Sequence, residues 1–319
     1  MFKLTVPVLL ITFNRPDSAK AVFDRVRRQR PTKLYLASDG PRDSVPGERE
    51  VVYSLREDLE KAVDWDCEVI KIYSDKNLSC AKRVATAIDE VFAHENEAII
   101  LEDDCVANDS FFEFCQEMLV RYRNDERVLS ISGSKVIDYD PGPDKDYFFS
   151  KVFWCWGWAT WKRAWEIFDY DLKDYEQRKN DPVFDEVIFE KDANWILKEN
   201  FDKLLQTEPR YAWDYIFYFY SILNGGYHIF PKYNLVTNIG FGGDCTNTTK
   251  KPKWYVEETR EMTFPIRLQD DIEWEREYDR QSFIKTKQQG IIVHIKRFLG
   301  MDTDVSVFSK EFWQRRKGK

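Results

Sequence analysis

Residues 98–104 read Ala-Ile-Ile-Leu-Glu-Asp-Asp, so a run of apolar side chains is followed at once by three carboxylates. A short apolar run bounded by charge is typical of a buried strand, and the carboxylates then lie where the strand ends. Like charges in one place cost free energy unless a positive charge lies among them, and a divalent cation that holds phosphate oxygens meets that need. In the alternative interpretation, Asp103, Asp104 and Asp109 only cap a helix that begins near Ser110. Because capping needs a single acid, the sequence favours a metal site.

The sequence around this stretch alternates between apolar runs and segments of helical periodicity. We expect strands at residues 6–13, 33–38, 67–73, 98–101 and 128–132. Between them, the spacing of apolar residues predicts helices at residues 17–28, 48–63, 79–94 and 109–123. This alternation predicts an α/β fold in which a mostly parallel open sheet is flanked by helices.

The second half of the chain is less regular. An aromatic block extends from Phe153 to Trp161, and a glycine-rich loop occupies residues 238–244. Between these features we expect helices near residues 162–169, 182–206 and 212–224, and then a strand at 227–230. We therefore divide the chain into an N-terminal half, a second half of the same domain and a C-terminal helical appendage, at residues 1–135, 136–250 and 251–319.

Composition and charge limit the class of function. The chain has 319 residues, of which 43% are hydrophobic and 33% charged, a balance typical of globular proteins. Its net charge of −8 opposes nucleic-acid binding, which needs an excess of basic residues. The six cysteines lack the spacing of a zinc site and are interpreted as reduced thiols. With no long apolar run near the start, these features predict a cytoplasmic protein.

The C-terminal appendage differs in charge from the rest. It is acidic from Glu257 to Asp279 and then basic, and residues 290–299 combine apolar with basic side chains. One hypothesis is that this last segment rests on an anionic membrane surface, which would make the protein peripheral at the inner face of the membrane. Packing against the body or a second subunit is the alternative that we favour.

Open α/β sheets bind ligands at the carboxyl ends of their strands, so the residues after each predicted strand deserve the first inspection. Arg15 follows the first strand, Asp39 the second and Asn77 the third. Asp39 can accept a hydrogen bond from a base or a ribose hydroxyl, although Asp39-Gly40 is also a turn signal. In combination with the three acids at residues 102–104, a nucleotide site is the better interpretation.

Cationic residues near these strand ends could neutralise a diphosphate. Lys82 and Arg83 fall in the first turn of a helix that we expect Ser79 to cap, and Arg15 precedes another helix. Cations in a first turn oppose the helix dipole, and an anionic ligand would compensate for this. A solvated surface is the alternative.

Asp214 is a further candidate because its neighbours from Trp213 to Tyr220 are apolar or aromatic. Partial desolvation raises the proton affinity of a carboxylate, which suits a general base that acts on a hydroxyl. The residues alone leave the alternative open, in which Asp214 is a buried acid paired with Arg210 or a tyrosine hydroxyl.

Taken in order, these motifs resemble the GT-A glycosyltransferases. The resemblance is carried by Pro-Val-Leu-Leu-Ile-Thr-Phe-Asn-Arg-Pro from Pro7, Ser38-Asp39-Gly40, Asn77-Leu78-Ser79-Cys80-Ala81, Ile100-Leu101-Glu102-Asp103-Asp104-Cys105, the aromatic block, Trp213-Asp214-Tyr215 and Asn238-Ile239-Gly240-Phe241-Gly242. More narrowly, the chain is similar to bacterial relatives of N-acetylglucosaminyltransferase I, the nucleotide-diphospho-sugar or hemolytic-protein-like transferases, over about residues 4–250.

The resemblance implies a GT-A fold and an inverting, metal-dependent glycosyltransferase. Such an enzyme moves a sugar from a nucleotide-sugar donor, with UDP as the default nucleotide, to a hydroxyl of a glycan or lipid-linked acceptor. Asp104 matches the residue of the DXD motif that ligates Mn²⁺ or Mg²⁺, and Asp214 matches the catalytic base. The other implied residues are Phe13, Asn14, Arg15, Asp39, Asn77, Arg83, Glu102 and Asp103 for the donor nucleotide, and Trp156, Trp158, Trp213 and Gly240 for the acceptor or sugar.

One loop departs from the family pattern. Bacterial relatives often carry a histidine in an Asp-Ala-Thr-His-Thr sequence after Phe-Gly, where this chain has Asn247. Asn247 is expected to hold phosphate or metal more weakly.

Two other functions remain open at this stage. A nucleotidyl- or phosphoryl-transferase would use similar acids, but the sequence lacks the glycine-rich phosphate loop that we would expect of it. A catalytically silent nucleotide-sugar or glycan-binding protein would bind the donor without turnover.

Overall fold

The computed structural model describes residues 2–135, 137–189, 191–241, 251–252 and 255–286. Its first half is a parallel sheet in the order β3-β2-β1-β4, with β1 (Val8–Thr12), β2 (Lys33–Ser38), β3 (Glu68–Tyr73) and β4 (Glu97–Glu102). The strands predicted over this half are confirmed, because β1, β2 and β4 are the buried apolar runs seen in the sequence.

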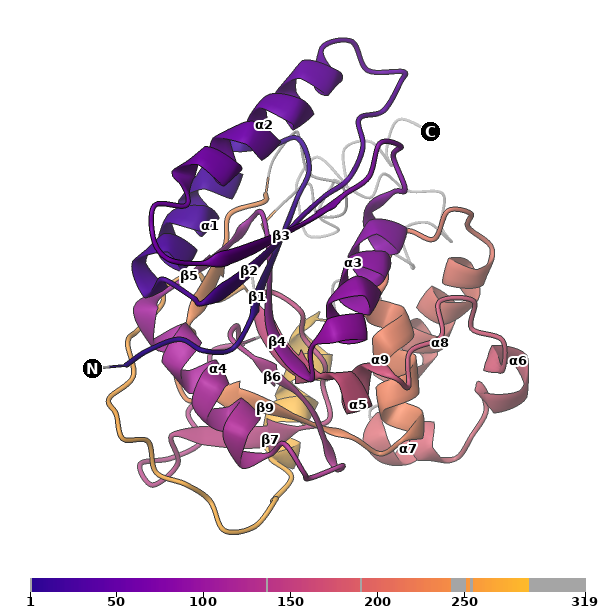
Figure 1. Ribbon diagram of the computed structural model, residues 1–319. Helices are drawn as coiled ribbons and strands as arrows, with labels where there is room; N and C mark the ends of the chain where they lie inside the picture. The colour runs from indigo at the N-terminus through magenta and orange to yellow at the C-terminus, as the bar shows by residue number, and fades with distance from the viewer. Residues whose placement is uncertain (1, 136, 190, 242–250, 253–254, 287–319) are drawn as a thin grey trace, which may run out of the picture.

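Amphipathic helices connect these parallel strands. They are α1 (Pro16–Gln29), α2 (Glu48–Ala62) and α3 (Cys80–His94), which agree with the predicted ranges to within a residue or two. In Figure 1, α1 and α2 lie on one side of the sheet and α3 on the other. The α/β fold with a mostly parallel sheet and flanking helices is therefore confirmed.

The predicted cap of α3 is wrong. Ser79 occupies the N-cap position, but its side chain makes no capping hydrogen bond and its backbone has a φ of 72°. Its hydroxyl is buried without a hydrogen-bond partner among the described residues. The next helix, α4 (Asp109–Arg121), is capped by Asn108, whose side chain accepts a hydrogen bond from the Phe111 amide at 3.1 Å. Asp103 and Asp104 are therefore not needed as caps.

The sheet continues through strands from the second half, in the order β4-β8-β6-β9-β7. These strands are β6 (Val128–Ser132), β7 (Tyr147–Ser150), β8 (Trp158–Trp161) and β9 (Tyr227–Pro231). The strand β8 is antiparallel to both of its neighbours, and it was not expected within the aromatic block. A separate antiparallel pair joins β5 (Cys105–Ala107) to β10 (Val236–Asn238).

The remaining helices pack together at one end of the molecule, at the right of Figure 1. They are α5 (Lys162–Trp165), α6 (Tyr175–Arg178), α7 (Val183–Val187), α8 (Lys191–Leu205) and α9 (Asp214–Leu223). The single helix expected over residues 182–206 is thus two helices, because the backbone leaves the helical region at Ile188, where φ is −108° and ψ is 69°. The helix expected over residues 162–169 is a single turn.

One hydrophobic core extends through all three parts of the predicted division. It includes Leu10 and Ile100 from the parallel strands, Trp158 and Phe217 from the second half, and Tyr278 beyond residue 250. Residues 276–286 are helical and pack on the body. The boundaries at residues 135 and 250 remain predictions.

Candidate functional site

A cavity of about 600 Å³ opens at the carboxyl ends of β1 and β4. This is the edge at which an open α/β sheet binds its ligands. Residues from both halves of the chain line the cavity, and several of them belong to the set predicted from sequence: Arg15, Glu102, Asp104, Trp156, Trp213, Asp214 and Gly240.

One side of the cavity carries charge, and we call it the acidic wall: Arg15, Glu102, Asp104, Asn238 and Gly240. Arg15 pairs with Asp103, and its Nη2 lies 3.0 Å from Oδ2 of Asp104. Asn238 donates from Nδ2 to Oδ1 of Asp104 at 3.2 Å. The Asp104 carboxylate is thus held from two sides and faces the cavity.

The protonation of the acidic wall reflects its crowding. Burial, together with the charges of Asp104, Asp103 and Asp214, raises the pKa of Glu102 to about 8. Burial also raises the pKa of Asp103 to about 6, although Arg15 opposes this rise. Burial alone would lower the pKa of Arg15, but the charges of Asp103 and Asp104 outweigh the effect of burial, and the pKa is raised. The wall therefore has more carboxylates than cations to balance them.

The position of Gly240 explains why this residue has no side chain. A Cβ atom at residue 240 would lie 2.1 Å from Oδ2 of Asp104 and 2.9 Å from Nη1 of Arg15. The pairing of β5 with β10 brings the two segments together, since Asn238 is in register with Cys105. A larger residue at 240 would displace the ion pair between Arg15 and Asp104.

Another part of the cavity lining is formed by rings, and we call it the aromatic wall: Phe153, Trp154, Trp156, Trp213 and Phe241. Trp156 packs edge-on against Trp154 and Phe241, with ring centroids 4.8 and 5.8 Å away. Flat rings of this kind bind the apolar faces of sugar rings and bases. Trp158 lies behind the wall, 1% exposed and stacked on Trp213 at 5.4 Å. Trp213 is also buried in the core, but of the predicted acceptor residues only Trp158 does not line the cavity.

Asp214 is the first residue of α9 and lines the same cavity. Its charge contributes to the raised pKa of Glu102, so the two carboxylates are electrostatic neighbours. Arg210, the cation offered as a possible partner, donates its hydrogen bonds to the backbone carbonyls of Tyr170, Leu204 and Asp171. Asp214 is thus an electrostatic neighbour of the acidic wall, and it begins the helix whose N-cap residue is Trp213 of the aromatic wall.

Asp39, Asn77 and Arg83 do not line this cavity and form a second cluster after β2 and β3. Oδ1 of Asp39 accepts hydrogen bonds from the amides of Gly40 and Leu78, both at 2.9 Å. Burial raises the pKa of Asp39, while those amides and the charge of Arg83 oppose the rise. Asn77 donates to the Gly40 carbonyl at 2.8 Å, so the cluster fixes the loops at these strand ends.

Sequence reasoning missed Arg56, which supports this cluster from within α2. Arg56 donates to the Asp39 carbonyl at 2.9 Å and to the Ser74 carbonyl at 2.7 Å, and its guanidinium lies over the rings of Tyr53 and Tyr73. An arginine in the middle of a helix carries no motif, so only the structure reveals it.

Phe13 and Asn14 bind neighbouring segments and also do not line the cavity. The Phe13 amide donates to Oδ2 of Asp103 at 3.2 Å, and Asn14 donates to Oε1 of Glu48 at 2.8 Å. Both residues therefore fix the turn after β1 that carries Arg15.

The donor atoms of the acidic wall fit a cation that is shared with a ligand. Within the ranges that the structure describes, no group of three or more His, Cys, Asp or Glu side chains is arranged to hold a metal ion alone. Asp104 and Glu102 both line the cavity, and the pKa of Glu102 is raised because its burial and the neighbouring carboxylates outweigh the positive charge of Arg15. Protein Mg²⁺ sites commonly use one or two carboxylates and complete their shell with phosphate oxygens and water.

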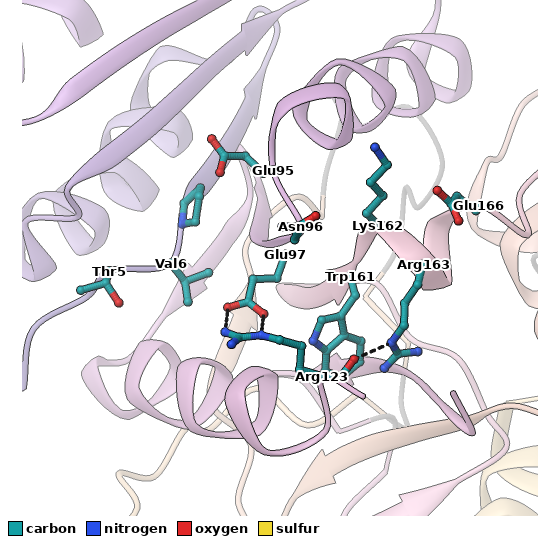
Figure 2. Close-up of a pocket in the computed structure, with 11 residues that line it drawn as sticks. Thr5, Val6, Glu95, Asn96, Glu97, Arg123, Trp161, Lys162, Arg163 and Glu166 are labelled. Atoms are coloured by element: carbon teal, nitrogen blue, oxygen red, sulfur yellow. Dashed lines mark hydrogen bonds and ion pairs between the residues drawn. The ribbon is translucent and has the colours of Figure 1, made fainter. Parts of the chain in front are cut away.

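A second cavity, of about 610 Å³, lies at the opposite ends of β1 and β4 (Figure 2). Arg123 forms two hydrogen bonds with Glu97 there, at 2.9 and 2.6 Å, and Arg163 donates to the Arg123 carbonyl at 2.9 Å. None of the residues predicted from sequence lines this cavity in the described part of the chain. The cavity at the carboxyl ends is therefore the candidate site.

Two predictions fall on residues outside those that the structure describes. They are the loop at residues 244–248, which includes Asn247, and the segment at 290–299. In the part of the chain that is described, no helix has the length and hydropathy to cross a bilayer.

No family model and no curated protein matches this chain. Among solved structures, it is similar to the mannosyltransferase PcManGT from Pyrobaculum calidifontis in complex with GDP-Man and Mn²⁺, at 14% identity over 50% of this chain and 45% of that one, with a TM-score of 0.33. It is also similar to HddC from Yersinia pseudotuberculosis, at 11% identity over 40% of this chain and 57% of that one, with a TM-score of 0.27. This chain thus spans about half the length of each. At these scores, neither likeness assigns an activity.

Proposed function

We propose that this protein is an inverting glycosyltransferase of the GT-A type. It moves a sugar from a nucleoside-diphosphate donor, with UDP as the expected nucleotide, to a hydroxyl of a glycan or lipid-linked acceptor. The observation that carries the proposal is the single cavity in which Arg15 and Asp104 share the space with Asp214. A diphosphate group needs cations on one side, and an acceptor hydroxyl needs a base on the other.

The acidic wall is the donor-diphosphate end in this proposal. Arg15 lines the cavity and offsets negative charge on the diphosphate as it leaves. Asp103 holds Arg15 in place through their ion pair, and the Phe13 amide holds Asp103. Asp104 and Glu102 would hold Mn²⁺ or Mg²⁺ against the phosphate oxygens, and such a cation supplies further charge stabilisation when bound.

Asp214 is the proposed general base. Its carboxylate takes the proton of the acceptor hydroxyl while the acceptor oxygen forms a bond to the anomeric carbon of the donor sugar. The bond between that carbon and the diphosphate oxygen breaks, and its electron pair leaves with the nucleoside diphosphate. Attack on the face opposite the leaving group inverts the anomeric configuration. The aromatic wall supports the sugar through ring contacts with Trp156 and Trp213.

A thermal-shift panel tests the donor site first. UDP, GDP, dTDP and CMP are each added with and without Mn²⁺ to the wild type and to Asp104→Ala. A nucleotide at about a hundred times its dissociation constant stabilises the fold by roughly 2.7 kcal/mol. We expect one nucleotide to do so only with Mn²⁺, and the shift to disappear in the variant. Asp109→Ala is the matched control, because Asp109 lies on α4 and accepts from Gln29 at 2.9 Å.

Turnover of the nucleotide-sugar then tests the base. Asp214→Asn should lower kcat by roughly 10²- to 10⁴-fold, the range for loss of a general base, with nucleotide binding retained. Normal nucleotide binding without turnover by the wild type would favour a silent binding protein instead. No thermal shift with any nucleotide would contradict the donor site itself.

A further inference from the structure

The cavity has a third part, formed by two buried hydroxyl groups. Tyr218 is 8% exposed and Ser282 is 1% exposed, and both line the cavity. Neither the Tyr218 hydroxyl nor the Ser282 Oγ has a hydrogen-bond partner among the described residues. Most buried polar groups in proteins are hydrogen-bonded, so two unpartnered buried hydroxyls on residues that line one cavity need a physical explanation.

These two groups come from different parts of the chain. Tyr218 lies on α9, and Ser282 lies in the helical residues 276–286 beyond the second half of the domain. Three donors hold this second helix through Asp279: the Ser150 hydroxyl at 2.5 Å, the Lys151 amide at 2.9 Å and the Trp274 indole at 2.6 Å. The Ser282 side chain is therefore fixed at the cavity rather than left on a loose segment.

Asp214 is a neighbour of both the third part and the acidic wall. It shares a face of α9 with Tyr218, because residues four apart on a helix are neighbours. Its charge also affects the pKa of Glu102 on the acidic wall. Asp214 is therefore close to both groups within the one cavity.

The chemistry of the third part is neutral and polar. Burial and the nearby Asp279 raise the pKa of Tyr218 well above its ordinary value, so its hydroxyl keeps its proton and can donate. A serine hydroxyl both donates and accepts. Neutral hydroxyls of this kind match the hydroxyl groups of a sugar ring, whereas a lipid chain would leave both of them without a partner. The carboxylate of Asp214, which lines the same cavity, would repel an anionic group.

We propose that Tyr218 and Ser282 form the acceptor subsite and bind ring hydroxyls of a neutral sugar, which places its reacting hydroxyl beside Asp214. This inference rests on the proposed glycosyltransferase function and names the acceptor as a carbohydrate. The two residues contribute to acceptor specificity, and the acidic wall alone binds the nucleotide.

The test uses the full-length protein saturated with Mn²⁺ and the nucleotide that gave the thermal shift. Binding of a panel of methyl hexosides is measured by saturation-transfer NMR for the wild type, Tyr218→Phe and Ser282→Ala. Each variant removes one hydroxyl and should weaken sugar binding about tenfold, or roughly 1.4 kcal/mol. Neither variant should lose thermal stability, because the hydroxyl that it removes has no partner in the fold.

Two matched variants on α9 control for a purely structural effect. Tyr220→Phe removes a hydroxyl that donates to Asp174 at 2.7 Å, and Ser221→Ala removes one that donates to the Phe217 carbonyl at 2.8 Å. These controls should keep sugar binding and lose some stability. The subsite is overturned if the first two variants bind every methyl hexoside as the wild type does, or if the wild type binds none while still binding nucleotide. If the wild type bound no nucleotide at all, the result would instead contradict the proposed function.

Discussion

The acidic wall and the aromatic wall face the same cavity, but they are held in place in different ways. On the acidic wall a few specific contacts fix each group, such as the ion pair of Arg15 with Asp104 and the hydrogen bond from Asn238. The aromatic wall is held by ring packing, and each ring touches several others: Trp213 alone contacts Phe153, Trp158 and Trp165.

This difference predicts that substitutions on the acidic wall change mainly binding, whereas substitutions on the aromatic wall change mainly the stability of the fold. Where a few polar contacts fix a side chain, one substitution changes what the site can bind and affects the fold little. Where many rings share the packing, one substitution affects the whole cluster and so the stability of the fold.

The largest effect should come from Trp158→Ala, which removes the support of the aromatic wall. Because Trp158 is 1% exposed and stacked on Trp213, its loss should lower the free energy of unfolding by about 3–5 kcal/mol. Urea denaturation measures this change. Nucleotide binding by the fraction that remains folded should be unchanged.

Trp156→Ala is the control for this prediction, since Trp156 is half-buried and faces the cavity. It should cost less stability than Trp158→Ala. If Trp158→Ala left stability intact but abolished nucleotide binding, this would refute the assignment of stability to the aromatic wall and of nucleotide binding to the acidic wall.

An intermediate effect is expected for Gly240→Ala, which crowds the acidic wall. The added methyl group would lie 2.1 Å from Oδ2 of Asp104 and must displace it. Overpacking of this kind costs roughly 1–3 kcal/mol, so we expect the affinity for nucleotide and Mn²⁺ to fall about tenfold to a hundredfold. Isothermal titration calorimetry gives this affinity directly.

A double variant shows whether the effect acts through Asp104. In the background of Asp104→Ala, adding Gly240→Ala should lower the free energy of unfolding less than it does in the wild type, because the carboxylate with which it clashes most closely is gone. Additive losses in the double variant would place the role of Gly240 elsewhere.

The smallest effect is on the pH dependence of stability. A group behind the aromatic wall and a group on the acidic wall should change it in opposite directions. His228 lies behind the aromatic wall, its ring 5.3 Å from Phe153 and its Nδ1 2.7 Å from Oγ of Ser130. Burial and the charge of Lys151 lower its pKa to about 3. Below about pH 6.5, the ordinary pKa of histidine, His228 is protonated in the unfolded chain but not in the folded one. About 1.4 kcal/mol of stability should therefore be lost by pH 5.5.

The carboxyl of Glu102 on the acidic wall works in the other direction. Its pKa of about 8 lies above the ordinary value of 4.5, so the folded chain holds a proton that the unfolded chain releases, and its contribution to stability grows as pH falls through that window. Urea denaturation at pH 7 and 5.5 should therefore show His228→Gln losing less stability on acidification than the wild type, and Glu102→Gln losing more. Identical pH dependence of all three proteins would contradict both assignments.

The parallel half of the fold could be predicted from sequence because its signals are local. Three of its strands, β1, β2 and β4, are short apolar runs, and each helix has an apolar stripe, as in α1 with Val22 and Val26 buried. The strand β8 could not be predicted, since it lies in an aromatic block where tryptophan spacing fits neither pattern and its partners in β4 and β6 are distant in sequence.

The sequence pointed to the charged residues and to some of the aromatic residues that line the candidate site, but not to its buried hydroxyl groups. Glu102, Asp104 and Asp214 stand out because carboxylates interrupt apolar sequence. Tyr218 and Ser282 look like ordinary core residues in sequence, and only the fold brings them to one cavity. Asp39 and Arg83 do not line this cavity but lie in the cluster after β2 and β3, and their contact with the donor remains a prediction.

The insertion of β8 between β4 and β6 has a consequence for synthesis on the ribosome. Both β4 and β6 emerge before residues 158–161, yet each has β8 as a neighbour in the finished sheet. Until Trp161 has left the exit tunnel, the nascent chain therefore carries two open strand edges at the centre of its future sheet. Unpaired edges of this kind are sites of aggregation, so chaperones that bind exposed strand edges would protect the chain at this stage of translation.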